Sequence, residues 1–315
     1  MTGPLALLDS ASLYFRAFYA LPDSMTAPDG TSVNAVRGFA DTVARILTDR
    51  RPSRLVACLD ADWRPEFRVN ALPTYKAHRV AEEGDGIEEE VPDKLSPQVP
   101  IILDLLDAVG LCTAEATGYE ADDVIGALVH REKTDPVEVI SGDRDMFQVV
   151  RYEPTPATVW YVGRGWNRVE VIGPAELAAK YDLPVADAGP RYADMAVLRG
   201  DPSDGLPGVP SIGEKTAAKL IREFGTLQAL IEGAAAGDKR IPKRAQTNII
   251  ASADYLAAAP TVVAVAVDAP VVLDRDDRVP AAPADPDRVQ ALKERWDLGA
   301  SVDRLLAAIK AQPSA

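Results

Sequence analysis

The 315-residue chain has few of the residues that build several common kinds of site. It contains only two histidines and two cysteines, and neither His78 nor His130 has a metal-binding partner at helical spacing. A zinc centre of His and Cys ligands is therefore not expected, and no Ser-His-Asp or Cys-His arrangement offers a nucleophile. Cys58 and Cys112 lie among apolar residues, so we expect buried thiols in a reducing compartment rather than a disulfide.

Long apolar runs are also lacking. No basic segment precedes an apolar stretch at the start, and no uncharged span is long enough to cross a bilayer, so we expect no membrane association and a cytoplasmic protein. Bases are fewer than acids, 34 against 48, and the net charge of −14 is unusual for a protein that binds nucleic acid.

The acids are concentrated in a few places. Nine belong to the motifs described below, and seven more lie in one short stretch. Without these sixteen the chain has 32 acids against 34 bases, so the total charge does not exclude nucleic acid. A generally acidic protein remains the alternative. The other seven crowd one short stretch: Glu82, Glu83, Asp85, Glu88, Glu89, Glu90 and Asp93.

Short apolar runs alternate with helical patterns in the first half, which predicts an α/β fold with a central, mostly parallel sheet flanked by helices. We expect strands at 5–8, 55–59 and 137–140, helices at 33–48, 98–109 and 121–131, and a hairpin of 158–162 with 168–172 around the turn 163–167.

Three regions follow from these patterns. We expect an α/β core over 1–184, in which an arch or loop spans about 73–100 and the stretch 80–100 is exposed and mobile. Residues 185–260 read as a helical module, and 261–315 as a strand at 261–273 followed by helices at 286–296 and 302–309.

Acidic residues follow the predicted strands. Parallel strands present their carboxyl ends at one edge of a sheet, so acids placed there converge. An acid after a strand is more often a turn former or a helix cap, but five such motifs together favour a shared metal site. The nine acids are Asp9, Asp60, Glu120, Asp122, Asp123, Asp143, Asp145, Asp201 and Asp204.

Oxygen ligands alone suit Mg²⁺ or Mn²⁺. The chemistry most dependent on such sites is phosphodiester hydrolysis by two ions about 4 Å apart. Because Mg²⁺ retains several waters, some of the nine acids are expected to act through water.

A locally basic turn follows the last acidic pair. In the segment 208–216, glycines allow a close backbone approach, and the amides at the next helix start attract a phosphate. Lys215, Lys219 and Arg222 share one face of that helix, which predicts duplex binding without sequence preference. A second basic segment, 75–79, either offers Tyr75 for base stacking and Lys76 or Arg79 for the reacting phosphate, or is a solvated helix start.

Four motifs in this order resemble the 5′-nuclease family, which includes the nuclease domain of bacterial DNA polymerase I, phage 5′ nucleases and flap endonucleases. They are GYEADD at 118–123, GDRD at 142–145, GDPSDGLPGV at 200–209 and IGEKTAAKL at 212–220. The resemblance runs from about Leu5 to the final helix. It implies a PIN-like sheet with helices on both faces, an arch or loop over the site, and a helix–three-turn–helix module.

The resemblance also implies residue roles. Asp9, Asp60, Glu120, Asp122 and Asp123 correspond to ligands of a first metal region, and Asp143, Asp145, Asp201 and Asp204 to ligands of a second. Lys76 and Arg79, with Asp143 and Asp145, correspond to catalytic residues, and Tyr75, Lys76 and Arg79 to the base of the arch. DNA contacts, and a K⁺ ion at the turn, are implied for Gly208, Val209, Ser211, Gly213, Lys215, Thr216 and Lys219.

The family implies a freestanding, bacterial, nucleoid-associated monomer that cuts DNA at a 5′ flap, nick or 5′ end, or RNA-primed DNA, with two or three Mg²⁺ or Mn²⁺ ions. Ser211 stands where the family's turn commonly has glycine, and the acidic stretch 80–93 is unusually negative for an arch. A ribonuclease of the same wider fold and a non-catalytic binder of DNA structures are the two alternatives.

Overall fold

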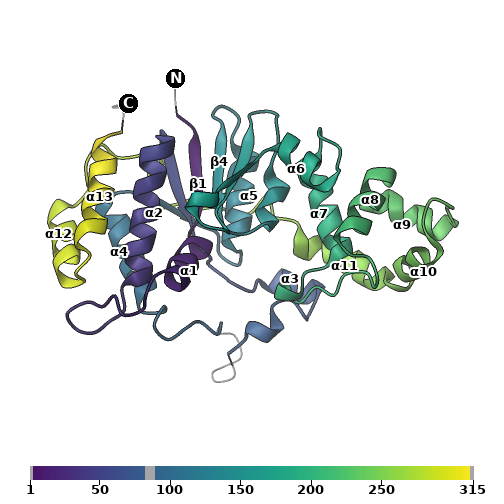
Figure 1. Cartoon of the computed structure of the whole chain (residues 1–315), viewed down its shortest axis with the longest axis horizontal. Helices are drawn as coiled ribbons and strands as arrows, with labels where there is room; N and C mark the ends of the chain where they lie inside the picture. Colours follow the sequence, from purple (N-terminus) through teal and green to yellow (C-terminus); the bar gives the residue numbers. More distant parts are fainter. Residues whose placement is uncertain (1–2, 82–88, 313–315) are drawn as a thin grey trace.

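The computed structural model describes residues 3–81 and 89–312 of the chain. A seven-stranded sheet lies at the centre, in the order β6-β5-β4-β1-β2-β3-β7 (Figure 1). All neighbouring strands are parallel except the two edge pairs, β5 with β6 and β3 with β7. The strands are β1 Leu5–Asp9, β2 Arg54–Cys58, β3 Cys112–Glu115, β4 Val137–Ser141, β5 Ala157–Tyr161, β6 Glu170–Ile172 and β7 Val272–Leu273.

Helices cover both faces of this sheet, as the sequence predicts. On one face α13 packs along α2, and α12 packs against α4; on the other lie α5, α6 and α7. The helices are α1 Ser10–Ala20, α2 Asn34–Arg50, α3 Glu66–Ala71, α4 Gln98–Val109, α5 Ala121–Arg131, α6 Pro174–Tyr181, α7 Ala188–Arg199, α8 Glu214–Phe224, α9 Leu227–Ala236, α10 Lys243–Ala251, α11 Ala253–Val263, α12 Pro286–Arg295 and α13 Gly299–Lys310.

Strand β1 shows why the chain folds in this way. Its five residues are all buried, because the side chains alternate between two apolar layers. Leu5 and Leu7 join the layer under α5, whereas Ala6 and Leu8 join the layer under α2. A strand covered on both faces carries polar groups only at its end, and β1 ends in Asp9.

The helical module extends away from the sheet. Helices α8, α9 and α10 lie at the far end of the molecule in Figure 1, on the opposite side from α12 and α13. Helix α8 packs against α7, and α11 runs back to pack against α7 and α3. Within the described ranges no helix is long and apolar enough to cross a membrane.

Two predictions about local structure are wrong. Residues 261–273 do not form one strand: Thr261–Val263 are the last turn of α11, and only Val272–Leu273 pair as β7. Side-chain packing overrides the weak helix propensity of β-branched residues here, since Val262 is buried.

The second concerns the stretch 80–100, which the sequence predicts to be exposed and mobile. Leu95 and Gln98 are buried, and the Gln98 carboxamide accepts a hydrogen bond from the backbone N–H of Ala35 (2.8 Å) and donates one to Asn34 Oδ1 (2.9 Å). This end of the stretch is therefore docked on the start of α2. Residues 82–88 lie outside the described part of the chain.

Candidate active site

The three central strands bring acidic residues to one edge of the sheet. Asp9 ends β1, and Asp60 and Asp143 each follow their strand, β2 or β4, by two residues. Because β4, β1 and β2 are adjacent and parallel, the three side chains meet at the carboxyl edge. They line a cavity of about 1340 Å³.

Other predicted acids reach this cavity from helices and turns. Glu120 and Asp122 lie at the start of α5, Asp145 follows β4, and Asp201 precedes a 3₁₀ turn at Pro202–Asp204. Asp204 lines a small second cavity that shares Glu120 and Asp145 with the main one. Eight of the nine predicted acids are therefore gathered around connected space, although they come from segments up to 195 residues apart.

Burial and mutual repulsion make several of these carboxylates hard to ionise, Asp9 and Asp145 among them. Burial raises the pKa of Asp9 to about 7, with further increases from Asp143 and Asp60, while a hydrogen bond from Ser141 opposes the change. Burial likewise raises the pKa of Asp145 to about 8, together with the charges of Asp143 and nearby acids. Carboxylates crowded in this way favour a bound cation.

The donor set fits hard divalent cations. Every predicted ligand is a carboxylate, which is the donor that Mg²⁺ and Mn²⁺ prefer. Across the part of the chain that the structure describes, no three His, Cys, Asp or Glu side chains converge closely enough to enclose an ion alone. The acids surround the cavity at a wider spacing, which suits an ion that keeps several of its waters.

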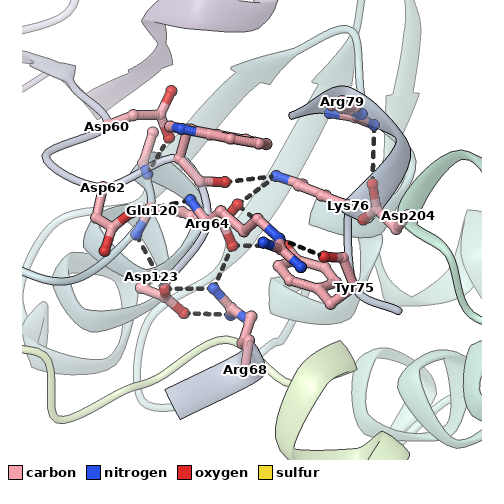
Figure 2. A network of polar contacts seen from close by, with 12 residues as sticks. Asp60, Asp62, Arg64, Arg68, Tyr75, Lys76, Arg79, Glu120, Asp123 and Asp204 are labelled. Carbon is pink, nitrogen blue, oxygen red and sulfur yellow. Dashed lines mark hydrogen bonds and ion pairs between the residues drawn. The ribbon is translucent and has the colours of Figure 1, made fainter. Parts of the chain in front are cut away.

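Glu120 is held by three side chains (Figure 2). Arg68 and Lys76 both form ion pairs with it, and the Tyr75 hydroxyl donates to its Oε2 at 2.7 Å. Lys76 also donates to the carbonyl of Trp63 at 3.2 Å. The predicted phosphate-binding lysine therefore lies at the cavity wall, bound to a predicted metal ligand.

The structure contradicts the prediction that Tyr75 stacks on a base. Its ring is only 3% exposed and lies in the apolar core, so no nucleobase reaches either face. Its hydroxyl orients Glu120 instead.

Asp123, one of the nine predicted metal ligands, does not line the cavity. It is fully buried, and both oxygens form a bidentate ion pair with Arg68 at 2.7 Å. Its oxygens also accept from the backbone N–H of Glu120 (3.2 Å) and of Ala266 (2.8 Å). Asp123 thus completes the capping box of α5, whose N-cap is Glu120, and is the partner of a buried arginine.

The second predicted cation, Arg79, is paired with Asp204. Its guanidinium donates to Asp204 Oδ1 (2.9 Å) and to the Ser203 carbonyl (2.8 Å), as Figure 2 shows for Asp204. The backbone N–H of Lys76 donates to the Asp204 carbonyl at 3.0 Å. Lys76 and Arg79, at the base of the predicted arch, are therefore hydrogen-bonded to the turn that carries Asp201 and Asp204.

Several side chains in the cavity wall were not identified from the sequence. Arg68 carries no local signal, because it is one arginine in a short helix. Asp62 follows Asp60 by two residues, a spacing that matches Asp143 and Asp145 and was a usable clue. The remaining lining cations are Arg16, Arg144 and Arg199.

The predicted DNA-binding turn has the expected backbone. Gly208 and Ser211 adopt positive φ angles of 68° and 65°, so Ser211 holds the left-handed conformation that a glycine would take. Gly213 is exposed directly before α8, and no atom would meet a side chain there. The side chain of Val209 is buried and its N–H donates to the Leu198 carbonyl, so the side chain supports the turn from inside.

Helix α8 presents its basic face outward. Lys215 and Lys219 are exposed and Thr216 is half-buried, whereas Leu220 and Ile221 are buried against the module. Glu214 occupies the first turn and pairs with Arg199 at 3.5 Å, so one acid at this helix start is partly neutralised from the cavity side.

Comparison with known proteins identifies the family. The family described as 5′-3′ exonuclease, N-terminal resolvase-like domain, matches residues 4–182, and 5′-3′ exonuclease, C-terminal SAM fold, matches residues 188–287. A 5′-3′ exonuclease of Mycobacterium tuberculosis is 52% identical over 99% of this chain and 100% of that protein. DNA polymerase I of Mycobacterium bovis is 39% identical over 72% of this chain but only 24% of its own length.

A solved structure has the same fold. The bacteriophage T5 D15 flap endonuclease, in a complex with DNA and metal ions, superposes with a TM-score of 0.62 over 97% of both chains at 17% identity. The two family matches and the full-length relative together cover the sheet, the acidic cavity and the helical module. The chain is therefore a member of the 5′-3′ exonuclease family, and an enzyme of the nuclease class.

Proposed function

We propose that this protein is a structure-specific DNA 5′ nuclease, with 5′-flap endonuclease and 5′→3′ exonuclease activity in replication and repair. The observation that carries the proposal is the set of carboxylates around one cavity, fastened through Arg79 and Asp204 to a basic helical module. Its substrates are DNA with a 5′ flap, a nick or a 5′ end, including RNA-primed DNA. It acts as a monomer in the bacterial cytoplasm, at the nucleoid.

The cavity residues divide the chemical work. Bound Mg²⁺ or Mn²⁺, two or three ions, would supply a hydroxide nucleophile and stabilise charge on the departing 3′ oxygen. Asp9, Asp60, Glu120 and Asp122 hold one region of the cavity, and Asp143, Asp145, Asp201 and Asp204 hold the other. Lys76 and Arg79 orient the reacting phosphate and offset its charge. Attack on phosphorus breaks its bond to the 3′ oxygen, which takes up a proton, so the products are a 5′-phosphate and a 3′-hydroxyl.

The helical module holds the duplex. We assign this role to the turn of Gly208, Ser211 and Gly213 and to Lys215, Thr216 and Lys219 on α8, with a K⁺ ion at the turn. Positive φ angles at Gly208 and Ser211 turn the backbone for a close approach to phosphate, and the exposed lysines add charge. We assign catalysis to a core over 1–184 and duplex binding to a module over 185–260. The segment 261–315 packs back on the core.

A labelled 5′-flap duplex incubated with Mg²⁺ or Mn²⁺ tests the proposal. We expect cleavage at the junction that a chelator stops. We also expect Asp143→Asn to lower the rate by roughly 1000-fold, because the substitution removes a charged carboxylate at the centre of the acid group. Asp268→Asn, an exposed acid outside the cavity, is the matched control and should cleave as the wild type does. Cleavage that survives the chelator or Asp143→Asn refutes the assignment.

The same assay separates the alternatives. Flap substrates with all-DNA, RNA-primed and all-RNA 5′ arms compare the two sugar types directly. Preference for the all-RNA arm identifies a ribonuclease, and tight flap binding with no product in any metal identifies a non-catalytic binder.

A further inference from the structure

Arg68 is a buried hub between parts of the chain that are far apart in sequence. Its side chain is 3% exposed, and all five of its N–H donors are used. Nη1 donates to Glu120 and to Asp123 Oδ2 (2.7 Å), and Nη2 to Asp123 Oδ1 (2.7 Å). Nη2 also donates to the carbonyl of Ala264 (3.3 Å), and Nε to that of Val262 (3.0 Å).

These contacts join three structural units. Arg68 lies on α3, directly before the base of the arch; Glu120 and Asp123 start α5; and Val262 and Ala264 form the end of α11. Helix α11 packs against both α3 and α7, and α7 in turn packs against α8. A single guanidinium therefore connects a cavity carboxylate to the helices that carry the basic face. Figure 2 shows Arg68 below Glu120 and Asp123, with its guanidinium directed at both.

Stability alone is a weak reason for such a cluster. Removing charged groups from water costs several kcal/mol per ion, and well-packed apolar side chains of equal volume stabilise a fold at least as well. The buried charges nevertheless fix geometry, because a bidentate pair such as Arg68 with Asp123 has one preferred orientation. That orientation also fixes Glu120, whose carboxylate faces the cavity.

We propose that Arg68 is a positioning residue that couples duplex binding by the helical module to the placement of Glu120 in the cavity. Movement of the end of α11 is transmitted through the Val262 and Ala264 carbonyls to the guanidinium, and from there to the carboxylate. The inference rests on the proposed duplex binding by the module.

Tyr75 provides the matched comparison. Its hydroxyl also binds Glu120, at 2.7 Å, but none of the described side-chain hydrogen bonds of Tyr75 reaches α11. Tyr75→Phe therefore loosens Glu120 without cutting the link to the module. Arg68→Lys keeps the charge but has three donors instead of five, and Arg68→Met/Asp123→Asn removes a complete ion pair without leaving a buried charge alone.

Two measurements that need no cleavage test the inference. The first is the Mn²⁺ affinity of the protein alone, by calorimetry. Side chains that hold a metal ligand from behind change metal affinity by about 10–100-fold, so we expect weakening of about 10-fold in Arg68→Lys, in the double variant and in Tyr75→Phe. Thermal melting of each variant establishes that it is folded.

The second measurement is the affinity for a duplex closed by a hairpin at each end, with and without Mn²⁺. This DNA offers no 5′ end, so binding is separated from turnover. Linked sites change each other's affinity by about 5–150-fold. We expect Mn²⁺ to change the duplex affinity of the wild type and of Tyr75→Phe by a factor in this range, and that of both Arg68 variants by a factor below about 3.

The outcomes are distinct. Coupling that persists in folded Arg68 variants overturns the inference, as does a wild type that binds the closed duplex with the same affinity in Mn²⁺ and without it. A wild type that does not bind the closed duplex at all refutes the duplex-binding role of the module instead. If the double variant does not fold, Arg68→Lys decides the question alone.

Discussion

Gly205 is the point where the acidic turn touches the base of the arch, and it makes a sharp test of that contact. Its φ is +73°, and its carbonyl accepts a hydrogen bond from the Thr74 hydroxyl at 2.8 Å. The next contact along, from Lys76 N–H to the Asp204 carbonyl, is 3.0 Å. We predict that Gly205→Ala separates these two segments and slows cleavage strongly.

The size of the effect follows from the geometry. A Cβ at position 205 would lie 2.1 Å from the Thr74 carbonyl oxygen. Such contacts do not fall below 3.0 Å, so one segment has to move by about 1 Å. A displacement of 1 Å at a reacting group costs up to about 100-fold in rate, or roughly 2.7 kcal/mol. Strain from the positive φ adds about 1–2 kcal/mol of lost stability.

Gly30→Ala is the matched control. Gly30 also has a positive φ, +90°, but no atom lies within 4 Å of a Cβ placed there, so it reports the strain without the collision. Single-turnover cleavage of the flap duplex and urea unfolding measure both quantities. We expect destabilisation in both variants, larger in Gly205→Ala because of the collision, and a lower cleavage rate in Gly205→Ala alone. A folded Gly205→Ala that cleaves within 3-fold of the wild type refutes the argument.

Two further predictions concern stability and binding. Burial disfavours the charged form of Glu132, but hydrogen bonds from Thr134 and its neighbours outweigh that effect and lower its pKa to about 2. The stabilisation that ionised Glu132 provides is therefore complete above its ordinary pKa of 4.5 and is lost as the pH falls towards 2. In urea titrations at pH 6, the free energy of unfolding of the wild type should exceed that of Glu132→Gln by at most about 3 kcal/mol, and the two values should converge near pH 2. A difference that stays constant with pH contradicts this. For DNA, Lys215→Ala and Lys219→Ala should each reduce the slope of log affinity against log salt by about 1, measured on the closed duplex, whereas Lys310→Ala, an exposed lysine at the end of α13, should leave the slope unchanged.

The placement of the acids could be predicted because it follows from a general rule. Parallel strands present their carboxyl ends at one edge, so Asp9, Asp60 and Asp143 were expected to meet without knowledge of any contact. The structure brings all three to the same cavity. The helical spacing of apolar residues was sufficient to predict α4 and α5, whose observed bounds coincide with the expected ranges.

The partners of the acids could not be predicted, because they depend on packing between distant segments. Arg68 meets Val262 across 194 positions, and nothing in the sequence near either residue signals the contact. Asp123 follows Asp122 directly, yet helical geometry turns one towards the core and the other towards the cavity. The two cations beside Tyr75 favour a ring that stacks on a base, and only the tertiary fold shows that this ring is buried.

The two cations at the base of the arch are held differently, and this difference bears on how they serve the phosphate. Lys76 provides one of three contacts to Glu120, since Arg68 and Tyr75 bind the same carboxylate. Lys76 is therefore able to turn towards a phosphate without leaving a buried anion unpaired. Arg79 provides the only ion pair of Asp204 among the described residues, and that carboxylate is 20% exposed. If Arg79 turns to a phosphate, Asp204 loses its ion-pair partner and keeps only the charge of nearby Lys76, so we expect a bound metal ion to favour the release of Arg79 more than that of Lys76.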